Sequence, residues 1–129
     1  MNLDLVTIVV PNYASAIDFF VDRLGFDLIE DTPTATNDGR SKRWVVVRPS
    51  GGGTGFLLAR ADGDRQAAAV GNQTGGRVAF FLRVEHFDSE YEAIRSKGVP
   101  FVGPPRTESY GRVAVFEDPW GNHWDLLGP

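Results

Sequence analysis

His123 and Asp125 are the two side chains near the end of the chain whose types and spacing are suited to acid–base chemistry. They follow the turn sequence Asp118–Gly121 and stand two residues apart in an apolar segment. Successive side chains of a β-strand point to opposite faces, so both ionisable groups share one face. Such a pair serves in acid–base catalysis or in metal binding, but a solvated hairpin face has the same pattern, and the strand pattern alone favours that simpler interpretation.

Composition excludes several classes of function. The 129 residues are 42% hydrophobic and 23% charged, with a net charge of −4, which is typical of one soluble globular domain. There is no basic surplus or basic run to bind nucleic acid, and no apolar stretch approaches the ~20 residues of a membrane span. The chain has no cysteine, which rules out disulfides and thiolate sites, and its N-terminus reads as a strand rather than a signal peptide. We therefore expect a cytoplasmic protein without nucleic-acid or membrane partners.

The pattern of the first half predicts one helix and four strands. Ile17, Phe20, Val21 and Leu24 have the spacing of one buried helical stripe, with Asn12 as its N-cap and Gly25 as its C′ residue. The polar segment Thr32–Arg40, which contains Pro33 and Gly39, is predicted to be a loop. The predicted strands are Leu3–Val10, Phe26–Glu30, Trp44–Arg48 and Thr54–Arg60.

The second half repeats this order after a connector. Ala61–Gly76 is rich in small and polar residues, and a helical turn is predicted around Gln66–Val70. Phe87, Tyr91 and Ile94 then form a helical stripe that ends before Gly98. Pro104-Pro105 is interpreted as a break. The predicted strands are Arg77–Val84, Val99–Val102, Gly111–Glu117 and Asn122–Leu127, so a βαβββ order occurs twice.

Several fragments, joined to this two-fold plan, make the chain similar to the vicinal oxygen chelate superfamily of glyoxalases, bleomycin-resistance proteins and extradiol dioxygenases. They are Asn12–Phe20, Leu24–Phe26, Arg43–Val45, Phe87–Gly98, and the ending Asp118–Asn122 with Trp124–Leu126. The resemblance implies an α+β fold of two tandem βαβββ modules whose mixed sheet curls into a cup with helices outside. It implies one domain over residues 1–129, with module one at 1–60, the connector at 61–76 and module two at 77–129. It also implies a homodimer.

In metal-using members of this superfamily, each module supplies two ligands, from its first and last strands. The corresponding positions here are Leu5, Arg77, Gly55 or Leu57, and Asp125. Only Asp125 can bind a cation, and Arg77 would oppose one. His123 could add a second ligand, but two ligands do not make a retained site. We therefore expect no metal and no other cofactor, and no catalytic residue can be assigned.

The interior of the implied cup should be an apolar cleft with a few charged groups, which is typical of a small-molecule site. Strand alternation predicts that the following residues bind the ligand: Leu5, Thr7, Leu57, Arg77, Phe81, Arg83, His123 and Asp125. The favoured hypothesis is a metal-free protein that holds a small organic molecule. One alternative is a lyase, isomerase or dioxygenase that uses His123 and Asp125 or an irregular metal, so enzymatic activity stays open. A dimeric scaffold with a closed cup and no ligand is the third.

Arg77 and Asp125 lead to a more specific prediction. Their positions suggest that they meet where the metal would otherwise sit, and that the guanidinium holds the carboxylate through two hydrogen bonds. Two alternatives remain at this stage. Arg77 could reach solvent while Asp125 pairs with water or His123, or Arg77 could bind an anionic group of the ligand.

Overall fold

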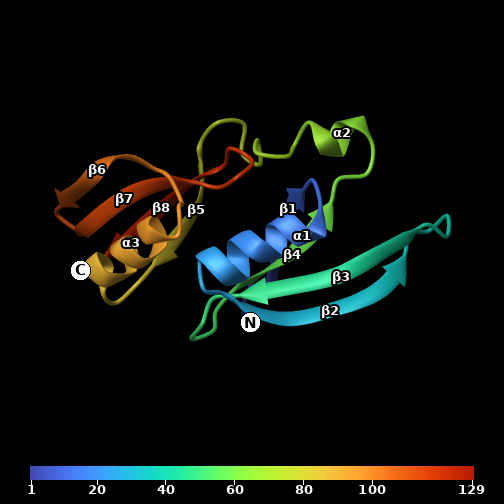
Figure 1. Cartoon of the computed structure of the whole chain (residues 1–129), viewed down its shortest axis with the longest axis horizontal. Helices are drawn as coiled ribbons and strands as arrows, with labels where there is room; N and C mark the ends of the chain where they lie inside the picture. Colours follow the sequence, from blue (N-terminus) through green and yellow to red (C-terminus); the bar gives the residue numbers. More distant parts are fainter. The chain divides into compact units, whose positions relative to one another are not determined.

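The computed structural model describes all 129 residues and divides them into two compact units, Met1–Val70 (unit 1) and Gly71–Pro129 (unit 2). Figure 1 shows the helices and the four-stranded sheet that each unit contains. The division falls inside the predicted connector, whose first ten residues belong to unit 1 and whose last six belong to unit 2. No helix is long and apolar enough to cross a membrane.

Unit 1 has a mixed sheet in the order β1-β4-β3-β2. β1 and β4 are parallel, whereas β4, β3 and β2 are antiparallel neighbours. A short α-helix continues into a π-helix between β1 and β2, and a second short helix follows β4. The bounds are β1 Leu5–Val10, α1 Tyr13–Ile17, η1 Asp18–Arg23, β2 Asp27–Ala35, β3 Ser41–Arg48, β4 Gly55–Arg60 and α2 Asp64–Ala67.

Unit 2 repeats this topology in the order β5-β8-β7-β6, again with the first and last strands parallel. Its bounds are β5 Val78–Arg83, α3 Phe87–Ser96, β6 Phe101–Glu108, β7 Gly111–Glu117 and β8 His123–Gly128. The prediction of an α+β protein with two tandem βαβββ modules is therefore confirmed.

The first helix begins as predicted but buries a different stripe. Asn12 caps it, because its side-chain oxygen accepts a hydrogen bond of 2.8 Å from the Ser15 amide. The buried residues are Tyr13, Ala16, Phe19 and Phe20, whereas Ile17, Val21 and Leu24 are only partly buried. The reason is the π-helix, in which the Leu24 amide bonds to the Phe19 carbonyl five residues earlier. A π turn contains more residues than an α turn and so shifts the phase of the side chains.

Two predicted interruptions are in fact strands. β2 continues through Pro33 to Ala35, over the first part of the predicted loop, and β6 runs through Pro104 and Pro105. Both are edge strands, where the missing N–H of a proline leaves no partner strand unsatisfied on the outer side. β6 also contains a register shift between Val102 and Arg106, around its two prolines. The predicted break at Pro104-Pro105 is therefore wrong, and the predicted loop is confirmed only from Thr36 to Arg40, between β2 and β3.

The closing hairpin has the predicted alternation and a buried turn. In β8 the residues Trp124 and Leu126 are buried against α3's side of the sheet, and His123 and Asp125 on the other face are partly exposed. The turn before it is organised by Asp118, a side chain with 2% exposure. Its carboxylate accepts hydrogen bonds from the amides of residues 120 to 122, from the Asn122 side chain and from the Trp124 indole.

Candidate functional site

Each sheet has one face that is covered by the helix of its own unit and one that is not. In unit 1 the side chains Ile8, Val47 and Leu58 are fully buried on the covered face, where Phe20 contacts Phe56. We call the other side the helix-distal face; in unit 1 it consists of Leu5, Thr7, Val9, Lys42, Trp44, Val46, Leu57 and Ala59, and in unit 2 of Phe81, Val115, His123, Asp125 and Leu127. Two aromatic side chains are exposed there, Trp44 by 40% and Phe81 by 64%.

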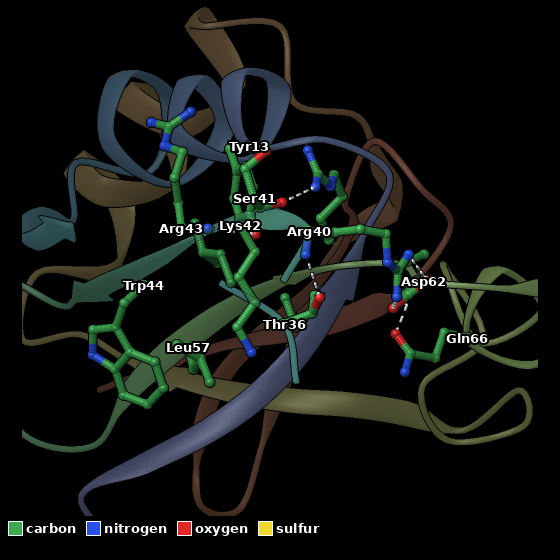
Figure 2. A pocket seen from close by; sticks show the side chains of 14 residues that line it. Tyr13, Thr36, Arg40, Ser41, Lys42, Arg43, Trp44, Leu57, Asp62 and Gln66 are labelled. Atoms are coloured by element: carbon green, nitrogen blue, oxygen red, sulfur yellow. Dashed lines mark hydrogen bonds and ion pairs between the residues drawn. The ribbon is translucent and has the colours of Figure 1, made fainter. Parts of the chain in front are cut away.

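A cavity of about 520 Å³ opens in unit 1 where β3 and β4 separate. Their pairing ends at Val45 and Leu58, although β3 begins at Ser41 and β4 continues to Arg60. Figure 2 shows the side chains around this opening. The lining residues are Tyr13, Thr36, Arg40, Ser41, Lys42, Arg43, Trp44, Leu57, Leu58, Ala59, Arg60, Ala61, Asp62 and Gln66. The volume is within the range of small-molecule pockets.

One wall of the cavity is held by Arg40, which links the loop between β2 and β3 to the segment after β4. Its guanidinium donates two hydrogen bonds to Asp62, of 2.9 and 2.8 Å, and one of 3.0 Å to Asp38. The pKa of Asp62 is lowered chiefly by the hydrogen bond from Arg40. Hydrogen bonds from Thr36 and then Arg40 lower the pKa of Asp38 to about 2. At neutral pH the cation of Arg40 is therefore paired with two ionised carboxylates.

Tyr13 stands at the other wall with two arginines over its ring. The guanidinium carbons of Arg43 and Arg60 lie 4.9 and 5.3 Å from the ring centroid, which is the geometry of cation–π contacts. Arg43 is also paired with Asp31, at 2.9 Å from Nε to Oδ1, and that hydrogen bond raises its pKa. Arg60 donates to the Ser41 carbonyl at 3.0 Å. Two of the four lining cations, Lys42 and Arg60, thus have no hydrogen bond to a carboxylate.

In unit 2 the helix-distal face brings Phe81, Asp125 and Val115 side by side on β5, β8 and β7. Burial raises the pKa of Asp125, and the positive charge of Arg106 partly offsets this. His123 lies on the same face at the next pairing position, with its Nε2 3.6 Å from Glu117 Oε2. The predicted shared face of His123 and Asp125 is confirmed. The two side chains do not form an ion pair with each other, and the carboxylate beside His123 is Glu117.

The predicted pairing of Arg77 with Asp125 is wrong. The ion pairs of unit 2 join Arg95 to Glu92, Arg106 to Glu108, Arg112 to Asp88 and His123 to Glu117, and none includes Arg77. Arg77 precedes β5, whereas Asp125 pairs with Phe81 four residues further on. A register shift between Val78 and Phe80 also interrupts the alternation on which the prediction rested.

The eight predicted ligand-binding residues fall into two groups. In unit 1, Thr7 and Leu57 are register partners and Leu5 pairs with Gly55. In unit 2, Phe81, His123 and Asp125 lie on the helix-distal face, Arg83 pairs with Leu127, and Arg77 lies outside the strand. Their role in binding stays a prediction. Of the eight, the cavity is lined by Leu57 alone.

Four lining residues of this cavity were not predicted from the sequence: Tyr13, Lys42, Trp44 and Arg60. A usable signal was present for two of them. Lys42 and Trp44 alternate with Val46 in β3 and so share the face of Leu57, which pairs with Val46. The predicted strand began at Trp44, so Lys42 was not assigned to any strand.

The residues at the superfamily's metal positions do not fit a metal ion. Leu5 and Leu57 have no donor atom, and Arg77 carries a positive charge. No group of three or more His, Cys, Asp or Glu side chains comes together in either unit. We therefore derive no chemistry from a metal.

Comparison with known proteins agrees with this fold and identifies the family. Residues 2–126 match the model of the Glyoxalase/Bleomycin resistance protein/Dioxygenase superfamily. The chain belongs to this superfamily. A protein of Shewanella frigidimarina (strain NCIMB 400), described only as uncharacterized, is 51% identical over 123 residues, which cover 95% of this chain and 89% of that protein.

Solved structures of the superfamily are also similar. TnmS3, an antibiotic-binding protein from Streptomyces sp. CB03234, is 28% identical with a TM-score of 0.76, and the match covers 100% of this chain and 96% of that one. A superfamily member from Sphaerobacter thermophilus DSM 20745 is 27% identical with a TM-score of 0.74, covering 100% and 98%.

Proposed function

We propose that this protein binds a small organic molecule without a metal and without chemical conversion. The observation that carries the proposal is the cavity of about 520 Å³ in unit 1, where Trp44 is 40% exposed beside Leu57. An exposed indole beside apolar side chains offers a flat surface for stacking. The antibiotic-binding activity of TnmS3 supports the same class of function by analogy.

An acid–base enzyme is the second candidate, and one observation favours it. Asp125 is a partly buried carboxyl group with a raised pKa, and His123 lies on the same face of β8. A carboxyl group whose pKa is shifted toward neutrality is suited to general acid–base catalysis. The first candidate is preferred because neither His123 nor Asp125 lines the cavity, which lies in unit 1.

We also propose a cytoplasmic homodimer. The support is the exposed edges of both sheets, in particular β2 and β6, which have a strand partner on one side only. Unpaired edges require protection from uncontrolled association, and a defined dimer provides it. Sedimentation equilibrium should give twice the mass of 14.1 kDa. A monomer at micromolar concentration would contradict the dimer without touching the binding proposal.

The binding proposal is tested with a neutral planar probe, 2-naphthamide. Isothermal titration should give saturable binding at one site per chain, and Trp44→Ala should weaken it about tenfold through loss of the stacking surface. Tyr110→Ala is the control, because Tyr110 is also an exposed aromatic residue, at the turn between β6 and β7, and does not line the cavity. Absence of saturable binding, or equal effects of the two variants, would contradict the proposal.

A further inference from the structure

We infer that the cavity of unit 1 selects a flat aromatic acid, with Lys42 neutralising the acid group while the ring stacks on Trp44. This inference rests on the proposed binding function and adds the chemical class of the ligand. It comes from the charges around the cavity and from the order of side chains along β3.

The lining is unusually basic for this chain. The whole protein has a net charge of −4, yet the cavity is lined by four cationic side chains and one carboxylate, Asp62. Two of the cations are neutralised in place, Arg40 by Asp38 and Asp62, and Arg43 by Asp31. Four cations thus face three carboxylates, which leaves one surplus positive charge around the cavity and favours an anion.

Of the other two cations, Lys42 and Arg60, Lys42 is the better placed to bind a ligand. Arg60 is already oriented by the Ser41 carbonyl and the Tyr13 ring. Lys42 forms no ion pair, and its neighbours on β3 and β2 offer it no carboxylate at its register partner, Thr34. Figure 2 shows Lys42 and Arg43 directed to opposite sides of β3, with Lys42 on the side of Trp44 and Leu57.

The spacing on β3 defines the ligand further. Lys42 and Trp44 are two residues apart on one face, which separates their Cβ atoms by about 7 Å along the strand. A ring stacked on the indole would therefore place a directly attached carboxylate near the ammonium group. Leu57 and Ala59 add apolar side chains to the lining of the same cavity.

A polyanion is a poorer match. The four cations exceed their three carboxylate partners by one charge, so the cavity can neutralise a single negative charge. A nucleic acid or polyphosphate would also meet the net negative charge of the remaining chain. A single carboxylate on an apolar ring system satisfies both the charge and the apolar side chains of the lining.

The test compares 2-naphthoate with 2-naphthamide, two planar probes that differ in charge. At low salt the wild-type protein should bind the carboxylate about tenfold more tightly than the amide. Lys42→Gln should reduce that ratio below about threefold by weakening the carboxylate alone. Lys97→Gln is the control, because Lys97 follows α3 in unit 2 and is absent from the cavity, and it should preserve the ratio. Because Lys42 is exposed, the thermal unfolding midpoint of the Lys42→Gln variant should match that of the wild-type protein.

The outcomes separate the two proposals. Equal affinity of the two probes in the wild type, with binding still dependent on Trp44, would overturn the acid preference and leave the binding function intact. Equal losses in Lys42→Gln and Lys97→Gln would also overturn it, because they would reveal a general effect of net charge. Failure of both probes to bind would contradict the binding function at this cavity together with the inference.

Discussion

Removing the carboxylate of Asp118 should destabilise the protein more than any other single change at a polar residue. Five donors converge on this side chain, at 3.1, 3.1 and 2.9 Å from the amides of residues 120 to 122, 2.9 Å from Asn122 Nδ2 and 3.2 Å from Trp124 Nε1. In Asp118→Ala the amides of Trp120 and Gly121 can be solvated, because these residues are partly exposed. The other three donors belong to Asn122 and Trp124, which are 4% and 1% exposed.

The magnitude follows from those three donors. A buried donor left without an acceptor costs about 1–3 kcal/mol, so with three such donors Asp118→Ala should lose at least about 3 kcal/mol of unfolding free energy. Asp118→Asn should lose about 2 kcal/mol, because one oxygen still accepts the backbone amides while the new NH₂ faces two donors. Rotation of the Asn122 amide cannot relieve this, since its oxygen accepts the Gln73 amide at 3.1 Å.

Urea denaturation followed by circular dichroism measures both variants, with Asp22→Ala as the control. Asp22 is an exposed aspartate in η1, and its loss should change stability by less than about 0.5 kcal/mol. A double-mutant cycle with Trp124→Phe should give a coupling of about 1 kcal/mol for the indole hydrogen bond. If Asp118→Ala costs no more than Asp22→Ala, the reasoning about the turn is refuted.

Three further predictions concern a close contact, a carboxyl group and metal content. In urea denaturation, Gly71→Ala should cost about 1–3 kcal/mol more unfolding free energy than Gly75→Ala. A Cβ at Gly71 would lie 1.6 Å from the Trp120 carbonyl oxygen, whereas Gly75 has a similar φ and open space around it. Equal costs of the two substitutions would contradict that contact. Asp125→Asn should become progressively more stable relative to wild type as pH rises above 3.8. Burial in the folded state raises the pKa of the Asp125 carboxyl, so the wild-type protein loses stability as this group ionises. A constant difference in stability from pH 3 to 7 would contradict that burial effect. Elemental analysis of the purified protein should find no stoichiometric transition metal, and about one per chain that is lost in Asp125→Ala would overturn the metal-free interpretation.

Local patterns predicted those parts of the fold that depend on neighbouring residues. The alternation in β8 gave the correct faces for His123 and Trp124, and the glycines at 25 and 98 mark both helix ends with positive φ. The stripe of the first helix was misassigned because a π turn has no distinctive signal in the sequence. Prolines in β2 and β6 were misinterpreted because only the sheet order reveals that these strands are edges.

The cavity depends on contacts between residues far apart in the chain. It opens where β3 leaves β4, and Arg40 closes one wall by binding Asp62, 22 residues later. No periodicity in the sequence specifies where two paired strands separate. The prediction for Arg77 failed for a similar reason, since the register shift near Val78 is a property of the β5–β8 pairing and not of β5 alone.

The central claim is that a small organic molecule binds beside Trp44, and the indole N–H signals of the three tryptophans test it most directly. In a ¹H–¹⁵N correlation spectrum, Trp44→Phe identifies the Trp44 signal, and Trp124 provides an internal control because its indole is buried and bonded to Asp118. Titration with 2-naphthoate should move the Trp44 signal saturably and leave the Trp124 signal unchanged. A Trp44 signal that does not move, or that moves no more than the Trp124 signal, would contradict the account.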